Sequence, residues 1–218
     1  MSYSVAIDGP AGAGKSTIAK RVAKELGYIY VDTGAMYRAM GLYLLHTQVD
    51  RQDAEAIAEA CRYADITIEY RDGEQVVLLN GENVNAYLRT EEVGEMASVS
   101  SAVPAVRLKL VELQRELAQK ADVIMDGRDI GTYVLPNADV KIYLTASSHT
   151  RAERRYLELQ AKGEACDLHK IEQDIIERDS RDMNREFAPL RQAEDAQLVD
   201  SSHMTIDEVV ERIISLCR

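Results

Sequence analysis

Hydrophobic residues along the chain gather in short apolar runs, which alternate with longer stretches of helical periodicity. The runs that predict strands lie at Ser4–Asp8, Tyr28–Val31, 122–126, 140–144 and 196–200. Two of them, DVIMD at 122–126 and VKIYL at 140–144, are continuously apolar, which is typical of strands buried on both faces of a parallel sheet. Strands that alternate with helices predict an α/β fold with a parallel sheet of about five strands, flanked by helices.

Helical periodicity and end signals place the helices between these strands. We expect helices at 16–26, 33–46, 53–64, from about 90, at 104–120, 148–162, 168–184 and from Thr205 onward. Asp32 and Thr33 can cap the second helix, and Pro104 stands in the first turn of the fifth. Thr205 and Glu208 have the spacing of a capping box.

The segment from 65 to 90 breaks the alternation. Two β-runs, DITIEY and QVVLLN, are joined by RDGE, and the pair Asp72-Gly73 is a hairpin turn signal. We interpret the segment as an antiparallel β lobe inserted into a single domain that spans 1–218.

Composition narrows the class of protein. A net charge of -11 argues against non-specific binding to nucleic acid, which needs a basic surface. Cys61, Cys166 and Cys217 have no C-x-x-C spacing, so we expect a reduced cytoplasmic protein without disulfides or a zinc site. No stretch is apolar enough to span a bilayer, and Asp8 comes too early for a signal peptide. We therefore expect no membrane partner.

The segment GPAGAGKS follows the first predicted strand and opens the first predicted helix. In this phosphate-loop pattern the glycines let backbone N–H groups curl round phosphate oxygens, while Lys15 reaches the β and γ phosphates. The Ser16 hydroxyl is a ligand for Mg²⁺, and the helix N-terminus adds partial positive charge. A plain glycine-rich turn is the competing interpretation, but it explains neither the spacing nor the strand–loop–helix context. The expected nucleotide-binding residues are Gly9, Pro10, Ala11, Gly12, Ala13, Gly14, Lys15, Ser16 and Thr17.

The loop alone does not say which reaction follows. A GTPase would show an N-K-x-D motif for guanine, and no asparagine here is followed by lysine. The chain is also too short for a motor or transporter ATPase with its additional signature elements. These absences favour a phosphotransferase that acts on a small molecule.

Three arginine-bearing segments are expected at the ligand crevice, where the strands of an α/β sheet end. They are DTGAMYR with Asp32, Thr33 and Arg38, DGRDIGT with Asp126, Arg128 and Asp129, and ERDSRDMNR with Arg178, Arg181, Asp182 and Arg185. Helical spacing predicts one common face for Arg178, Arg181 and Arg185. Each segment alone has an ordinary explanation. Residues 178–185 could be a solvated helix face, and Arg38 could be a snorkelling surface arginine. Asp126 could cap a helix in place of binding Mg²⁺. Together with the phosphate loop they favour phosphoryl transfer between two anionic substrates, which needs several cations.

The chain resembles the bacterial cytidylate kinases, a family of nucleoside monophosphate kinases. The likeness is carried, in order, by IDGPAGAGKST, DTGAMYRA, DGRDIGT, VKIYLTAS followed by RAERRY, and RDSRDMNREFAPL. It runs from about Val5 to the final helix, and DGRDIGT and RDSRDMNREFAPL are its most specific parts. The resemblance implies Mg²⁺-dependent transfer of the ATP γ-phosphoryl group to CMP or dCMP. It also implies that the 65–90 lobe binds the monophosphate and that 148–185 forms a lid.

The resemblance assigns roles to individual positions. Ser98, Arg107 and Asp129 would contact cytosine; Asp32, Arg178 and Asp182 would lie near the acceptor sugar; Arg38 and Arg128, with Thr33 nearby, would hold the acceptor phosphate. Arg185 would approach the transferring phosphoryl group, and Arg154 would come from the lid. With Lys15 and Arg128, these two arginines form the expected catalytic set. No general base is required, because the acceptor phosphate is already anionic at neutral pH.

Other interpretations stay open at this point. One is a P-loop kinase for another small acceptor, of the shikimate or dephospho-CoA type. Another is a nucleotide-binding switch without enzymatic activity. Tyr37 and Tyr133 are equally compatible with stacking on a base and with packing in the core. We expect a monomer, although the sequence carries no direct signal of oligomeric state.

Overall fold

The computed structural model describes residues 2–217. The chain divides into two compact units. One, here the P-loop unit, comprises Tyr3–Tyr28 and the chain from Ile124 onward; the other, the 29–123 unit, comprises Ile29–Val123 with Ser2. The main sheet has five strands in the order β2-β6-β1-β7-β8, and a second sheet has three, in the order β3-β4-β5. The predicted α/β class, with a five-stranded parallel sheet flanked by helices and a separate antiparallel sheet, is confirmed.

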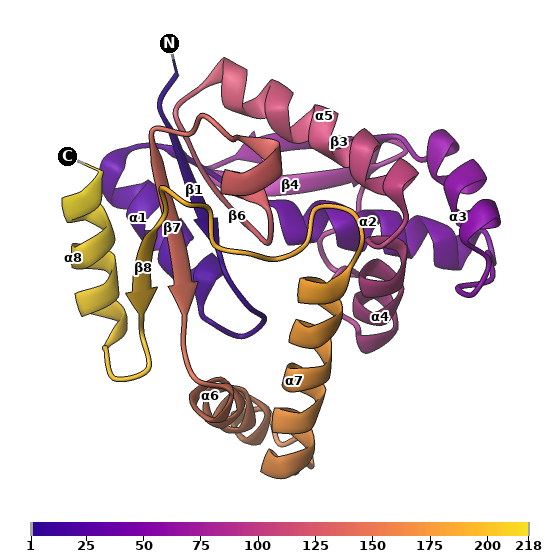
Figure 1. The fold of residues 1–218 in the computed structure, drawn as a ribbon. Helices are drawn as coiled ribbons and strands as arrows, with labels where there is room; N and C mark the ends of the chain where they lie inside the picture. Colours follow the sequence, from indigo (N-terminus) through magenta and orange to yellow (C-terminus); the bar gives the residue numbers. More distant parts are fainter. Residues whose placement is uncertain (1, 218) are drawn as a thin grey trace. The chain divides into compact units, whose positions relative to one another are not determined.

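The P-loop unit is built on parallel strands (Figure 1). Its elements are β1 (Ser4–Asp8), α1 (Lys15–Leu26), β6 (Val123–Gly127), β7 (Val140–Thr145), α6 (Ser148–Ala161), α7 (Leu168–Asn184), β8 (Gln197–Asp200) and α8 (Ile206–Leu216). β1 pairs with β7 from Val5↔Val140 onward, and β7 pairs with β8. α1 packs against α8 beside these strands. The centre of β1 is fully buried, as its apolar run predicts.

Local signals explain where several helices begin and end. α1 ends at Gly27, whose φ of 72° is the left-handed conformation that glycine adopts without strain. The predicted capping box at α8 is present, with Thr205 and Glu208 each bonding the other's backbone. Pro104 lies in the first turn of α5, also as predicted.

Most of the buried residues of α6 and α7 are charged. Arg151, Asp179 and Asp182 are buried on these helices, which pack against each other. α7 ends at Asn184, and Arg185 has extended backbone angles of -64° and 143°. Arg185, expected on one helical face with Arg178 and Arg181, is thus the C-cap residue that directly follows the last turn of α7.

The 29–123 unit combines helices with the small antiparallel sheet. Its elements are β2 (Ile29–Asp32), α2 (Thr33–His46), α3 (Ala54–Ala60), a 3-10 turn (Cys61–Tyr63), β3 (Ile66–Arg71), β4 (Glu74–Leu79), β5 (Glu82–Asn83), α4 (Glu91–Ser100) and α5 (Pro104–Lys120). The predicted hairpin is confirmed, since β3 and β4 pair from Ile66↔Leu79 to Arg71↔Glu74. The short β5 was not predicted. The expected helix at 53–64 is shorter, because its last turn tightens to 3-10 geometry before the chain extends at Ala64.

Two contacts hold α2 in this unit. The Asp32 side chain caps the helix by accepting a hydrogen bond from Ala35 N, as predicted. Gly41 lets α2 approach α4 closely: a Cβ at this position would lie 2.8 Å from the Ala97 nitrogen.

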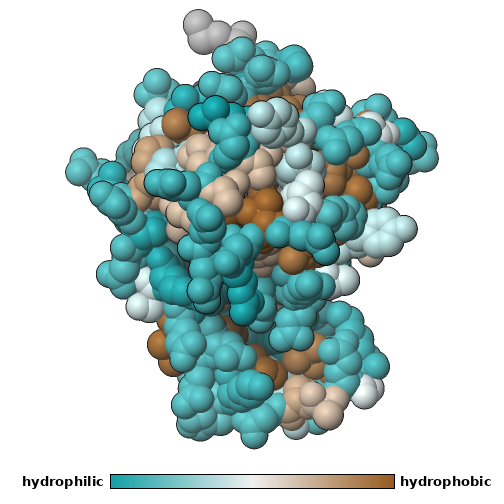
Figure 2. Space-filling view, turned by 90° about the vertical axis from the view of Figure 1, so that its right-hand side faces the viewer, coloured by the Kyte–Doolittle hydropathy of each residue, from teal (hydrophilic) through white to brown (hydrophobic). Residues whose placement is uncertain are grey.

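The face of the molecule in Figure 2 is mostly hydrophilic, with hydrophobic residues in separate small groups. Among the described residues, none of the helices is long and apolar enough to cross a membrane.

Candidate active site

The phosphate loop connects β1 to α1 and depends on two glycines. Gly9 has a φ of 151°, and a Cβ there would lie 1.9 Å from the Leu144 carbonyl oxygen on β7. Only glycine lets the loop pass this close to the neighbouring strand. Gly14, with a φ of 84°, is the N-cap residue of α1 and has no side chain to cap it. The first N–H groups of α1 therefore receive no side-chain cap from this residue, as a phosphate site requires.

Lys15 is buried at the start of α1. Its ammonium group donates a 2.7 Å hydrogen bond to the Pro10 carbonyl across the loop. Burial, together with the neighbouring Arg128, lowers the pKa of Lys15 to about 7, while Asp126 and Asp8 oppose the shift. A phosphate group in the loop would favour the charged form, since an adjacent anion stabilises an ammonium ion.

Ser16 and Asp126 form the candidate metal ligands. The Ser16 hydroxyl donates a 2.9 Å hydrogen bond to the Asp126 carboxylate at the end of β6. Hydroxyl and carboxylate oxygens are ligands that Mg²⁺ prefers, so the donor set fits this ion. The described residues contain no group of three or more His, Cys, Asp or Glu side chains that could hold a metal. Any Mg²⁺ here would therefore keep water or phosphate ligands.

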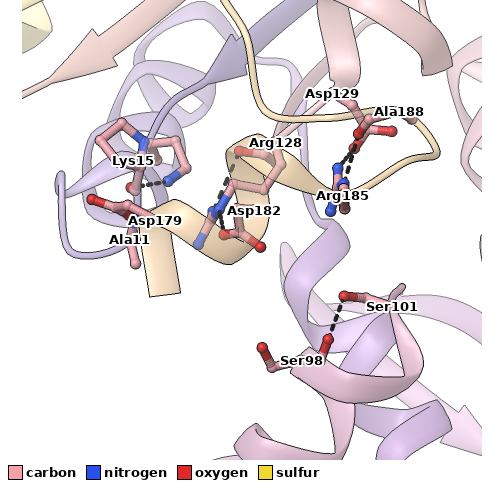
Figure 3. A network of polar contacts seen from close by, with 12 residues as sticks. Ala11, Lys15, Ser98, Ser101, Arg128, Asp129, Asp179, Asp182, Arg185 and Ala188 are labelled. Carbon is pink, nitrogen blue, oxygen red and sulfur yellow. Dashed lines mark hydrogen bonds and ion pairs between the residues drawn. The ribbon is translucent and has the colours of Figure 1, made fainter. Parts of the chain in front are cut away.

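Two ion pairs connect the DGRDIGT segment with α7 and the chain beyond it (Figure 3). Arg128 Nε donates a 2.8 Å hydrogen bond to Asp182 Oδ2. Burial opposes ionisation of Asp182, but Arg128 outweighs it, together with Arg178 and Arg185, so the pKa of this carboxyl is lowered. The Arg185 guanidinium lies 3.3 Å from Asp129 and also donates to the Ala188 carbonyl at 2.7 Å. The predicted residues Arg128, Asp129, Asp182 and Arg185 are thus brought together in one unit.

Other predicted residues of the P-loop unit lie in different surroundings. Arg154 donates hydrogen bonds to the carbonyl and hydroxyl of Ser201, just after β8. Arg178 is exposed on α7. The ring of Tyr133 packs edge-on against Phe187 with centroids 5.0 Å apart, which is a packing contact.

The buried charged residues Arg151, Asp179 and Asp8 of this unit were not predicted as site residues. Arg151 on α6 donates to both the Ala11 carbonyl and the Asp179 carboxylate, and Asp179 accepts from Ala11 N–H. The phosphate loop is thereby tied to α6 and α7. Asp8 accepts from two backbone N–H groups of the DGRDIGT segment. An acid that ends an apolar strand was the available signal for Asp8, the same signal that drew attention to Asp126.

The 29–123 unit holds the remaining predicted residues. The Arg38 guanidinium lies 3.2 Å from the Asp32 carboxylate. Thr33, the residue after Asp32, is buried. Arg107 on α5 is 1% exposed. Its guanidinium lies 5.3 Å from the centre of the Tyr37 ring, within cation–π range.

Arg107 is also linked to the end of α4. It donates a 3.2 Å hydrogen bond to the Ser101 carbonyl, and the Ser101 hydroxyl donates to the carbonyl of Ser98 (Figure 3). Ser98 itself is half-buried. These contacts hold the buried Arg107 guanidinium near the start of α5 and connect it, through Ser101, to Ser98.

The parallel sheet, the phosphate loop and the arginine–carboxylate pairs define a P-loop kinase. A family model described as cytidylate kinase matches residues 5–218, and the chain belongs to this family. The resemblance inferred from the sequence motifs is confirmed.

Individual relatives agree with the family assignment. A cytidylate kinase from Caldicellulosiruptor bescii is 52% identical over 213 residues, which cover 98% of this chain and 94% of the relative. One from Lactobacillus gasseri is 54% identical over 209 residues, covering 96% and 91%. Among solved structures, a gluconokinase from Sinorhizobium meliloti 1021 aligns with a TM-score of 0.51 at 12% identity, covering 99% of this chain and 91% of the other. That likeness concerns the fold alone.

Proposed function

We propose that this chain is a cytidylate kinase, which transfers the γ-phosphoryl group of ATP to CMP or dCMP and releases ADP with CDP or dCDP. The observation that carries the proposal is the pair Arg128 and Asp129, placed side by side in a family member. Each is bonded to an oppositely charged partner, Asp182 and Arg185. A cation beside a buried carboxylate suits an acceptor with a phosphate and an exocyclic amine.

The donor would bind through the phosphate loop. Backbone N–H groups from Gly9 to Thr17 would surround the ATP phosphates, and the Lys15 ammonium would leave Pro10 to contact the β and γ phosphates. Ser16 and Asp126 would hold Mg²⁺, directly or through water. When bound, the ion would neutralise part of the phosphate charge.

The roles of the acceptor-binding residues follow the family resemblance. We assign the phosphate to Arg38 and Arg128 with Thr33, the sugar to Asp32, Arg178 and Asp182, and the base to Ser98, Arg107 and Asp129. The pairs Arg38–Asp32 and Arg128–Asp182 support this assignment, because each holds a partly buried guanidinium by an ion pair. We also assign monophosphate binding to the 65–90 lobe and a lid function to 148–185.

Catalysis would consist of positioning and charge stabilisation. Arg185 would turn its guanidinium toward the transferring group, and Arg154 would leave Ser201 for the same region when the lid closes. Arginine suits this task because its planar fork pairs with two phosphate oxygens at once. The phosphate of CMP is the nucleophile and needs no base.

A coupled assay of ADP release tests the proposal. The acceptors are CMP, dCMP, UMP, AMP, GMP, shikimate and dephospho-CoA, with and without Mg²⁺. CMP and dCMP should be the best substrates by kcat/KM; if they are no better than the others, the assignment is wrong. Asp129→Ala should sharply weaken CMP use and spare ATP binding, whereas unchanged CMP kinetics would favour a kinase for another acceptor. Tight nucleotide binding without product would indicate a switch.

We also propose that the protein acts as a cytoplasmic monomer. Within the described residues the three cysteines are free thiols. Free thiols are typical of proteins from a reducing compartment. Light scattering during size-exclusion chromatography tests the oligomeric state, and a mass near 24.3 kDa is expected.

A further inference from the structure

Asp8 makes a bidentate contact with the DGRDIGT segment. It is the last residue of β1, is 4% exposed, and precedes the first glycine of the phosphate loop. Its Oδ1 accepts a 2.8 Å hydrogen bond from Ile130 N–H, and its Oδ2 accepts a 2.7 Å bond from Gly131 N–H. Both oxygens of one buried carboxylate are therefore bonded to consecutive backbone groups.

The segment that Asp8 contacts is a short helical turn, and the first two backbone N–H groups of this turn bond to Asp8. Ile130–Val134 forms a single π-helical turn, and Asp129 before it has no side-chain cap bond. The first N–H groups of any helical turn have no partner inside the turn. Asp8 supplies two of these partners, so the position of the turn depends on β1.

Gly131 is closely enclosed on its other side. A Cβ at Gly131 would lie 3.1 Å from Lys141 Cδ and 3.4 Å from Asp8 Oδ2. Lys141 is itself anchored, because its ammonium donates to both carboxylate oxygens of Asp195 at 2.7 and 2.9 Å. The space at Gly131 is thus closed by both the Asp8 carboxylate and the anchored lysine stem.

The held residues directly follow Arg128 and Asp129. We propose that Asp8 is a positioning residue: by binding Ile130 and Gly131 it sets the place of Arg128 and Asp129, and so the affinity and selectivity for CMP. The inference rests on the proposed function, in which these two residues contact the acceptor. It connects the strand that leads into the donor loop with the segment that reads the acceptor.

Asp8→Asn tests the proposal with little change in shape. One amide oxygen can still accept a hydrogen bond, but the amide NH₂ opposes the second backbone N–H. Leaving one buried backbone N–H without its acceptor corresponds to an effect of about tenfold or more. We expect KM for CMP to rise roughly tenfold, KM for ATP to stay within about twofold, and the preference for CMP over UMP to fall.

Asp139→Asn is the matched control. Asp139 accepts a 2.8 Å bond from Ser4 N–H at the opposite end of β1, so its loss disturbs the same strand without the DGRDIGT segment. We expect unchanged KM values for both substrates. Equal changes of both KM values in Asp8→Asn, or no change, would overturn the inference.

Two further measurements keep the test independent of folding and of the substrate. Gly131→Ala disturbs the same contact by placing a methyl group close to Lys141 and Asp8. It should raise KM for CMP selectively even if Asp8→Asn does not fold. Amide hydrogen exchange at Ile130 and Gly131 should accelerate in Asp8→Asn; unchanged protection would overturn the inference. If wild-type protein does not prefer CMP, the proposed function fails, while the exchange result still decides whether Asp8 holds the segment.

Discussion

The guanidinium of Arg151 on α6 donates a 2.6 Å hydrogen bond to the carboxylate of Asp179 on α7. Both side chains are at least nine-tenths buried, and each also binds the backbone of Ala11 in the phosphate loop. The helices proposed as the lid are therefore tied to the donor loop by this pair.

Removing one member of this buried pair should destabilise the protein strongly. Arg151→Ala or Asp179→Ala should lower the free energy of unfolding by about 3–5 kcal/mol, because the remaining charge is buried without its partner. In the double variant the loss should be less than the sum. Urea denaturation of all four proteins in a double-mutant cycle measures this coupling.

The exposed pair Arg155–Glu158 on α6 provides the control for that cycle. It has a similar separation of 3.0 Å, but both side chains are about half exposed. Arg155→Ala should cost at most about 1 kcal/mol, since solvent screens the pair. Equal costs for the two pairs would contradict the importance of burial.

Arg185→Ala tests the proposed arginine at the transferring group. We expect kcat to fall roughly a thousandfold, with a smaller change in KM for CMP, if the side chain stabilises charge that develops during transfer. Arg185 also faces the buried Asp129, so Arg185→Lys should restore part of the CMP affinity and little of kcat. Initial-rate kinetics with both substrates varied measures the two effects. Equal losses in kcat and CMP affinity would instead assign Arg185 to acceptor binding.

Two helical glycines of the 29–123 unit should respond in opposite directions to alanine. A Cβ at Gly41 would lie 2.8 Å from the backbone of α4, whereas one at Gly94 would meet nothing within 4 Å. Gly41→Ala should therefore lower the free energy of unfolding by about 1–3 kcal/mol. Gly94→Ala should raise it by about 0.5–1 kcal/mol, because alanine loses less entropy in a helix. Thermal and urea denaturation check both signs, and destabilisation by Gly94→Ala would be the contradicting result.

The pH dependence of stability should carry a contribution from Asp8. Burial, with a smaller contribution from Asp129, raises the pKa of Asp8 to about 7, although Lys15 and the two backbone N–H groups oppose the shift. Since the folded-state pKa lies above the ordinary value of 3.8, the folded protein keeps a proton that the unfolded chain releases. The contribution is present below pH 3.8 and is lost as pH rises through about 7.

Comparison with Asp8→Asn isolates this contribution. The unfolding free energy of wild type minus that of the variant should fall from about pH 4 to about pH 8, because wild type loses the Asp8 contribution while the asparagine does not titrate. Urea denaturation across this range measures it. A difference that stays constant with pH would show that Asp8 has an ordinary pKa in the folded protein.

Much of the fold follows from local pattern. The apolar runs at β1 and β7, the turn at Asp72-Gly73 and the capping box of α8 are contained in adjacent residues, so each was visible without three-dimensional information. β5 was not predicted, because a two-residue strand carries no periodicity. The helix expected at 168–184 is found as α7, and Arg185 is the cap residue directly after it.

The sequence by itself determined the phosphate loop, the strand–helix alternation and the family, since each depends on residue types at fixed short spacings. Only the tertiary structure decided the partners of the buried charges: Asp8 with Ile130 and Gly131, Arg128 with Asp182, and Arg151 with Asp179. These partners are separated by 28 to 123 residues in the chain. Burial makes such charges costly unless they are paired, and pairing across that distance exists only once the strands and helices have packed.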